Sequence, residues 1–82
     1  MVSLRNFGRN KTTLECDFYP EAIETEENKC HIVIDKETEE IVSVHIPETS
    51  ECYSMHKGGA RAILAKYVDG KGFPEVDYCI WG

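Results

Sequence analysis

The chain has 82 residues, a formal net charge of −6 and an apolar content of 41%. A chain of this length encloses one hydrophobic core, which excludes a multidomain organisation. No apolar run reaches the roughly 18–20 residues that a membrane-spanning helix needs. Arg5 interrupts the N-terminal residues before an apolar stretch develops, so we expect no secretory signal and a cytoplasmic location.

Acidic side chains are concentrated in residues 12–51. This segment has twelve Asp and Glu residues against Lys29 and Lys36, a net charge of −10, whereas residues 1–11 carry +3 and residues 52–82 carry +1. Nonspecific binding to nucleic acid requires clustered basic side chains against the phosphates. The charge pattern therefore disfavours nucleic acid as a partner, and it indicates either a solvated surface or an acidic surface for a basic partner.

The N-terminal residues show no sustained alternation, so we expect a loose arm at residues 1–11 followed by one domain at residues 12–82. In the next segment, Leu14, Cys16 and Phe18 alternate with polar residues, which predicts a half-buried strand that Pro20 ends. The charged residues 21–29 are then expected to connect this strand to a hairpin, with one helical turn around Ala22 and Ile23.

Two β-branched runs, residues 30–35 and 41–46, are separated by a charged five-residue segment and predict a β-hairpin. A shift of one residue would turn every side chain to the other face, so the apolar pattern also predicts the register. The best hydrophobic residues share one face when Ile34 lies opposite Val42 and Ile32 opposite Val44. That register places His31 beside His45 on the other face.

A helical stripe follows the hairpin: Ala60, Ile63, Leu64, Tyr67 and Val68 recur at the spacing of an amphipathic helix. We expect this helix to run from about Ser50, weakened at Gly58 and Gly59, and to stop with Gly70 in a left-handed conformation. Residues 75–81 alternate again and predict a closing strand with Val76, Tyr78 and Ile80 facing inward.

These elements give an α+β fold, a two-layer sandwich of order β-β-β-α-β. We expect a four-stranded, mostly antiparallel sheet with the helix packed on one face. A right-handed crossover would return the last strand beside the first one and parallel to it. Leu14, Cys16, Phe18, Ile32, Ile34, Val42 and Val44 would then lie beneath the helix.

The other side of this sheet, called here the open face, is the candidate binding surface. Large apolar side chains among polar ones on an uncovered face are typical of protein interfaces. The alternative is that the N-terminal arm covers this face. The predicted partner-binding residues are Tyr19, Val33, Ile41, Cys79, Trp81, His31 and His45.

Two further residue patterns suggest a binding site other than the open face, one for an anion and one for zinc. The flexible glycines and the cations at Lys57, Gly58, Gly59 and Arg61 resemble an anion contact at a helix start, although the spacing of a phosphate-binding loop is absent. The other interpretation is that the small residues allow the helix to approach the sheet or a partner closely. Cys52 and His56, four residues apart, could bind zinc with ligands drawn from Cys30, His31, His45 and Cys79, but no Cys-x-x-Cys pair supports a site.

No residue pattern predicts a catalytic group, a cofactor or a resident metal, and no motif identifies a family. The leading hypothesis is a small non-enzymatic protein-interaction module, of the kind made by short bacterial accessory genes, that acts through the open face and forms a homodimer. The alternatives are an acidic inhibitor or nucleic-acid mimic that binds a basic partner, and a small zinc-binding regulator.

Overall fold

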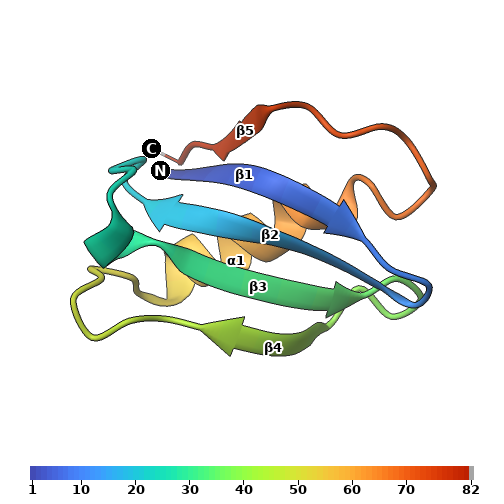
Figure 1. Cartoon of the computed structure of the whole chain (residues 1–82), viewed down its shortest axis with the longest axis horizontal. Coiled ribbons are helices and arrows are strands. Elements are labelled where there is room, and N and C mark those ends of the chain that lie inside the picture. The colour runs from blue at the N-terminus through green and yellow to red at the C-terminus, as the bar shows by residue number, and fades with distance from the viewer. Residues whose placement is uncertain (82) are drawn as a thin grey trace.

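The computed structural model describes residues 1–81 and shows one antiparallel sheet with a helix packed on one face (Figure 1). The sheet has five strands in the order β4-β3-β2-β1-β5. The α+β class is therefore confirmed, while the expected strand count of four is wrong. The elements are β1 (Val2–Arg9), β2 (Thr13–Pro20), the 3-10 turn η1 (Glu26–Asn28), β3 (Cys30–Asp35), β4 (Ile41–His45), α1 (Ser54–Ala65) and β5 (Val76–Cys79).

The additional strand is the segment that the sequence predicts to be a loose arm. Val2 and Leu4 of β1 are fully buried, and β1 lies between β2 and β5 in the sheet. The alternation that would have indicated a strand covers only residues 2–5, because the pairing with β2 shifts between Arg5 and Gly8 and Asn6 adopts a positive φ of 56°. The bulge breaks the period-two pattern.

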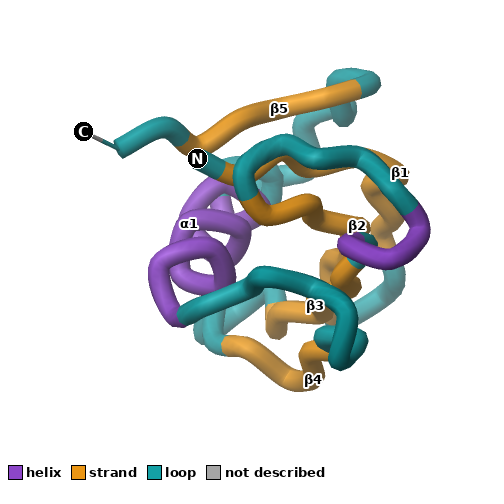
Figure 2. The backbone as a smooth tube through the Cα atoms, turned by 90° about the vertical axis from the view of Figure 1, so that its left-hand side faces the viewer, coloured by secondary structure: helices purple, strands orange, loops and turns teal. Residues whose placement is uncertain are grey.

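The core lies between the sheet and α1, which lies on one side of the sheet (Figure 2). Opposed pairs on three neighbouring strands fill it, such as Leu4 with Phe18 and Cys16 with Ile32. Ala60 and Leu64 of α1 pack on these pairs and are fully buried. The predicted inner face of β2 and β3 is confirmed.

The hairpin of β3 and β4 has the predicted register over most of its length. His31 lies opposite His45, and Ile32 lies opposite Val44. Between Val33 and Ile34 the register shifts, so that Ile34 pairs with Ile41, and Val42 becomes an extra residue on β4. The predicted pair of Ile34 with Val42 is therefore wrong.

The helix α1 begins at Ser54 rather than near Ser50 and continues through both glycines. Gly70, a few residues beyond the helix, has a φ of +91° and thus adopts the predicted left-handed conformation. Within the described part of the chain, no helix combines the length and the apolarity needed to cross a bilayer.

The last strand has the opposite sidedness to the one expected. β5 pairs antiparallel with β1 alone, with Cys79 opposite Val2 and Asp77 opposite Leu4. Since opposed residues share a face, Asp77 and Cys79 lie on the helix side, and Tyr78 lies on the open face. The direction of β5 agrees with the prediction, but β1 separates it from β2.

Candidate functional site

The predicted partner-binding residues do not share one surface. Ile41, Cys79 and Trp81 pack against the core on the helix side, so their placement on the open face is wrong. Cys79 and Trp81 lie close to Gly59, where a Cβ atom would be 3.2 Å from the Cys79 sulfur and 3.3 Å from the Trp81 ring. The open face keeps the other four: Tyr19, Val33, His31 and His45.

What remains on the open face is mainly a polar network centred on His31. Its Nδ1 atom lies 2.8 Å from a carboxylate oxygen of Asp17, and its Nε2 atom lies 3.1 Å from one of Glu15. Asn6 donates to the other oxygen of Asp17 at 2.7 Å, and Asn10 donates to Glu15 at 2.8 Å. These side chains satisfy one another, so this area lacks the apolar character of a docking patch.

One end of the open face is covered by residues 21–29. In Figure 2 this segment, with the short turn η1, lies on the side of the sheet opposite α1. Glu24 accepts hydrogen bonds from Ser3 Oγ at 2.8 Å and Arg5 Nε at 2.7 Å. Tyr19, opposite Ser3, is consequently only 8% exposed. The predicted contact residue Tyr19 is therefore not available to a partner on this face.

The predicted anion contact lies inside α1 rather than at its start. The helix begins at Ser54, so the amides of Gly58 and Gly59 belong to the regular hydrogen-bond ladder and do not point toward a ligand. Arg61 donates to the carbonyl of Glu39 at 3.4 Å. The close approach of Gly59 to β5 supports the other interpretation of these small residues.

Cys52 and His56 do not form a ligand pair. His56 is buried, its Nδ1 atom accepts from the Tyr53 amide at 3.1 Å, and its Nε2 atom lies 2.7 Å from Glu21. Burial raises the pKa of the Cys52 thiol to about 11, which keeps it protonated and unreactive near neutrality. Among residues 1–81, no group of three or more His, Cys, Asp or Glu side chains is arranged to hold a metal ion.

Exposed apolar side chains gather instead along β4, the strand at one edge of the sheet. Val42 is 59% exposed, Val44 37% and Ile46 40%. The sequence predicts Val42 and Val44 to lie beneath the helix, and this is wrong because α1 packs mainly on β1, β2, β3 and β5. The twelve-residue helix packs across the other four strands and leaves Val42 and Val44 of β4 uncovered.

The two edges of the sheet differ in how well they are protected against pairing with another strand. An edge strand has unpaired backbone N–H and C=O groups, which charged residues and short length normally shield. β5 is four residues long, contains Asp77 and follows Glu75. In contrast, β4 has no Lys, Arg, Asp, Glu or Pro over residues 41–46. The β4 edge, residues 41–46, is therefore the surface most open to a partner strand.

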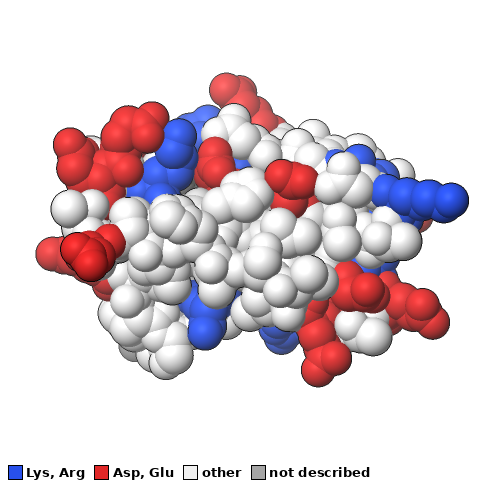
Figure 3. All heavy atoms as spheres, turned by 60° about the horizontal axis from the view of Figure 1, so that its bottom comes forward, with Lys and Arg blue, Asp and Glu red and all other residues white. Residues whose placement is uncertain are grey.

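Carboxylates lie at both ends of the β4 edge. The turn before β4 contains Asp35, Glu37, Glu39 and Glu40 with one lysine, and residues 46–53 contain Glu48 and Glu51 with no Lys or Arg. Figure 3 shows this side of the molecule with a mostly uncharged central band, acidic side chains at both ends, and Lys or Arg side chains at both ends and below the band. No ion pair within residues 1–81 involves Glu37, Glu39, Glu40, Glu48 or Glu51.

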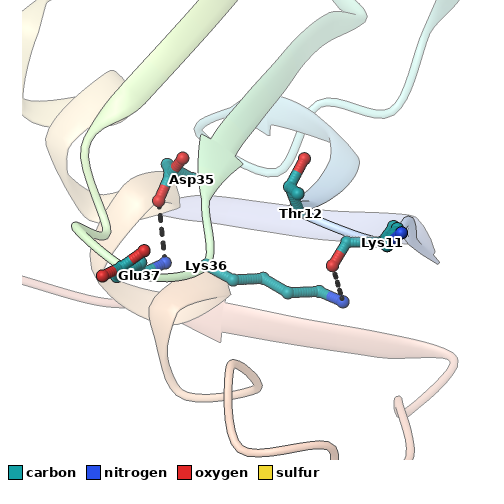
Figure 4. Close-up of a pocket in the computed structure, with 5 residues that line it drawn as sticks. All are labelled: Lys11, Thr12, Asp35, Lys36 and Glu37. Carbon is teal, nitrogen blue, oxygen red and sulfur yellow. Dashed lines mark hydrogen bonds between the residues drawn. The ribbon is translucent and has the colours of Figure 1, made fainter.

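A surface hollow of about 300 Å³ lies beside the turn that precedes β4 and is lined by Lys11, Thr12, Asp35, Lys36 and Glu37 (Figure 4). Asp35 accepts from the amide of Glu37 at 2.8 Å, and the Lys36 ammonium donates to the Lys11 carbonyl at 3.2 Å. The polar groups thus bond within the β3–β4 turn and across to the β1–β2 turn, and they do not converge on the hollow.

No protein-family model, curated protein or solved structure matches this chain.

Proposed function

We propose that this protein is a small, non-enzymatic interaction module that receives an extended segment of a partner protein at the β4 edge. The observation that carries the proposal is the exposure of Val42 and Val44 on β4 and of Ile46 directly after it, because β4 pairs with another strand on one side only. Addition of a strand to such an edge uses main-chain hydrogen bonds for affinity and alternate side chains for specificity.

The open face, where the sequence places the interface, is a weaker candidate. Its charged groups are matched internally around His31, and Tyr19 is covered by residues 21–29. The β4 edge is therefore a better candidate for the interaction surface than the open face. A cytoplasmic location is part of the proposal, and the four unpaired cysteines support it because reducing compartments maintain free thiols.

The test compares partner capture from a cell extract by the wild-type chain and by the double variant Val42→Lys, Val44→Lys. Lysine on an exposed edge opposes strand pairing, so we expect the double variant to lose the captured protein. Tyr78→Lys on the opposite edge is the matched control and should retain it. Amide chemical shifts that change along β4 on addition of the captured protein would locate the contact. Capture that survives the double variant would exclude the β4 edge.

The acidic-inhibitor hypothesis stays a second candidate, because the carboxylates flanking β4 are exposed and have no cationic partner on the described chain. They form two groups separated by an uncharged strip. A partner bound through charge alone should dissociate as salt is raised, whereas one bound through the edge should also depend on Val42 and Val44.

A further inference from the structure

The charges around the β4 edge restrict what can pair with it. β4 has five residues and spans about 17 Å at the usual strand rise of about 3.3 Å per residue. The acidic turn at residues 35–40 lies before it, and the acidic loop at residues 46–53 follows it. A strand docked along β4 would therefore have its two ends close to carboxylates and its centre beside Val42 and Val44.

A second copy of the chain is a poor fit to this arrangement. In an antiparallel pair of β4 strands, residues 35–40 of each copy would lie beside residues 46–53 of the other. In a parallel pair, each acidic segment would lie beside its own counterpart. Both orientations bring carboxylates together, and like charges placed opposite one another oppose association.

Within residues 1–81, the nearby Lys and Arg side chains form no ion pair with these carboxylates. Lys36 donates to the carbonyl oxygen of Lys11, and Arg61 contacts the carbonyl oxygen of Glu39 rather than a carboxylate. Lys29 is paired with Glu26 at 3.1 Å on the connection before β3. The flanking carboxylates remain available to positive charges that a partner supplies.

We infer that the occupant of the β4 edge is an extended segment with an apolar, β-branched centre and Lys or Arg at both ends, rather than a second copy of this chain. The inference rests on the proposed function and specifies the partner class. The basic residues should be separated by about five to seven positions, the length over which the segment follows β4. The apolar centre would cover the side chains that α1 leaves exposed.

Two synthetic peptides of about nine residues test the inference, Lys-Lys-Val-Thr-Val-Thr-Val-Lys-Lys and the same peptide with Glu in place of every Lys. Calorimetric titration into the full chain at low ionic strength should give at least roughly tenfold tighter binding of the Lys peptide. The difference should largely vanish in about 0.5 M salt because the ends are screened. The double variants E37Q/E39Q and E48Q/E51Q should each weaken the Lys peptide severalfold, whereas the control Glu75→Gln at the opposite edge should not.

Three results would overturn the inference: equal affinity for both peptides, binding of neither, or a homodimer that Val44→Lys abolishes. Its failure is distinguishable from failure of the proposed function. If the peptides bind equally while V42K/V44K still abolishes capture, the edge stands and only the partner chemistry is wrong. If capture is insensitive to the edge variant, the proposed function fails as well.

Discussion

The Nε2 atom of His56 lies 2.7 Å from a carboxylate oxygen of Glu21, and this contact joins the turn after β2 to the first turn of α1. His56 is 1% exposed, and its Nδ1 atom accepts the amide hydrogen of Tyr53. Both ring nitrogens are therefore satisfied, as a buried imidazole requires. The histidine that the sequence suggests as a metal ligand instead fixes the position of the helix start.

Replacing His56 with alanine should lower the free energy of unfolding by about 2–3 kcal/mol, because a buried ring and two hydrogen bonds are lost together. His45→Ala is the matched control, since His45 is exposed on β4 and should change stability by less than about 0.5 kcal/mol. Urea denaturation measures both. Equal losses in the two variants would contradict the structural role of His56.

The same contact makes stability depend on pH. The hydrogen bond from His56, followed by the N-terminal ammonium at 3.3 Å, lowers the pKa of Glu21 below its ordinary value of 4.5. A carboxyl with a lower pKa in the folded state contributes stability above its ordinary pKa and loses it as the pH falls through the folded value. Glu21→Gln should therefore be less stable than wild type at about pH 6, and the gap should shrink below about pH 4.5. A stability gap that stays constant between about pH 6 and about pH 4 would contradict this contribution of Glu21.

The two glycines of α1 should respond in opposite ways to alanine. Nothing lies within 4 Å of a Cβ atom at Gly58, so Gly58→Ala should raise the free energy of unfolding by about 0.5–1 kcal/mol through helix propensity. At Gly59 the Cβ atom would meet Cys79 at 3.2 Å and Trp81 at 3.3 Å. We expect Gly59→Ala to lack this gain and to fall about 1 kcal/mol or more below Gly58→Ala in thermal or urea unfolding. Equal stabilisation would mean that β5 does not pack on α1 at this point.

Leu4→Ala tests whether residues 2–9 are part of the sheet. Leu4 is fully buried against Phe18, so its truncation should cost about 2–5 kcal/mol. Ile80, which is 74% exposed, provides the control, and Ile80→Ala should cost less than about 0.5 kcal/mol. A loose arm would instead make Leu4→Ala nearly neutral in the same denaturation experiment.

Tyr67 should ionise only at high pH. Burial and then the hydrogen bond to Asp77 raise the pKa of Tyr67 to about 12, from an ordinary value of 10. Asp77→Asn should move the phenolate transition toward the ordinary value, as followed by ultraviolet absorbance and identified by its loss in Tyr67→Phe. Because the folded pKa is raised, the associated stability is present below about pH 10 and is lost as the pH rises toward about 12. An unchanged transition in Asp77→Asn would exclude this contact as a cause.

Local pattern accounts for the parts of the fold that can be predicted from the sequence. The strand Thr13–Pro20, the hairpin with His31 opposite His45, the buried stripe of Ala60 and Leu64, and the left-handed Gly70 all follow from periodicity and turn chemistry. In the strand, the hairpin and the helix, the side-chain pattern persists over several turns or alternations, whereas Gly70 is identified by turn chemistry alone. The sequence does not predict β1, because its bulge at Asn6 interrupts the alternation.

The candidate site could not be predicted from local patterns, because it depends on pairing between strands that are distant in the chain. The alternation of β5 predicts that its more apolar residues, Val76, Tyr78 and Ile80, face the helix. Pairing with β1 instead turns Asp77, Cys79 and Trp81 toward the helix. Tyr67 and Lys66 then satisfy the inward carboxylate of Asp77. The face that each residue of β5 occupies depends on its pairing with β1, which is distant in the chain. A local sequence pattern does not reveal this pairing.

The amino-acid sequence by itself determined the class of the fold, the inner face of its central strands and the acidic bias of residues 12–51. Only the tertiary structure decided that β4 stays outside the cover of α1 and that Val42 and Val44 are exposed. The physical reason is geometric: periodicity specifies which side of a strand is apolar, but the width of the sheet and the placement of one helix determine which apolar sides are buried.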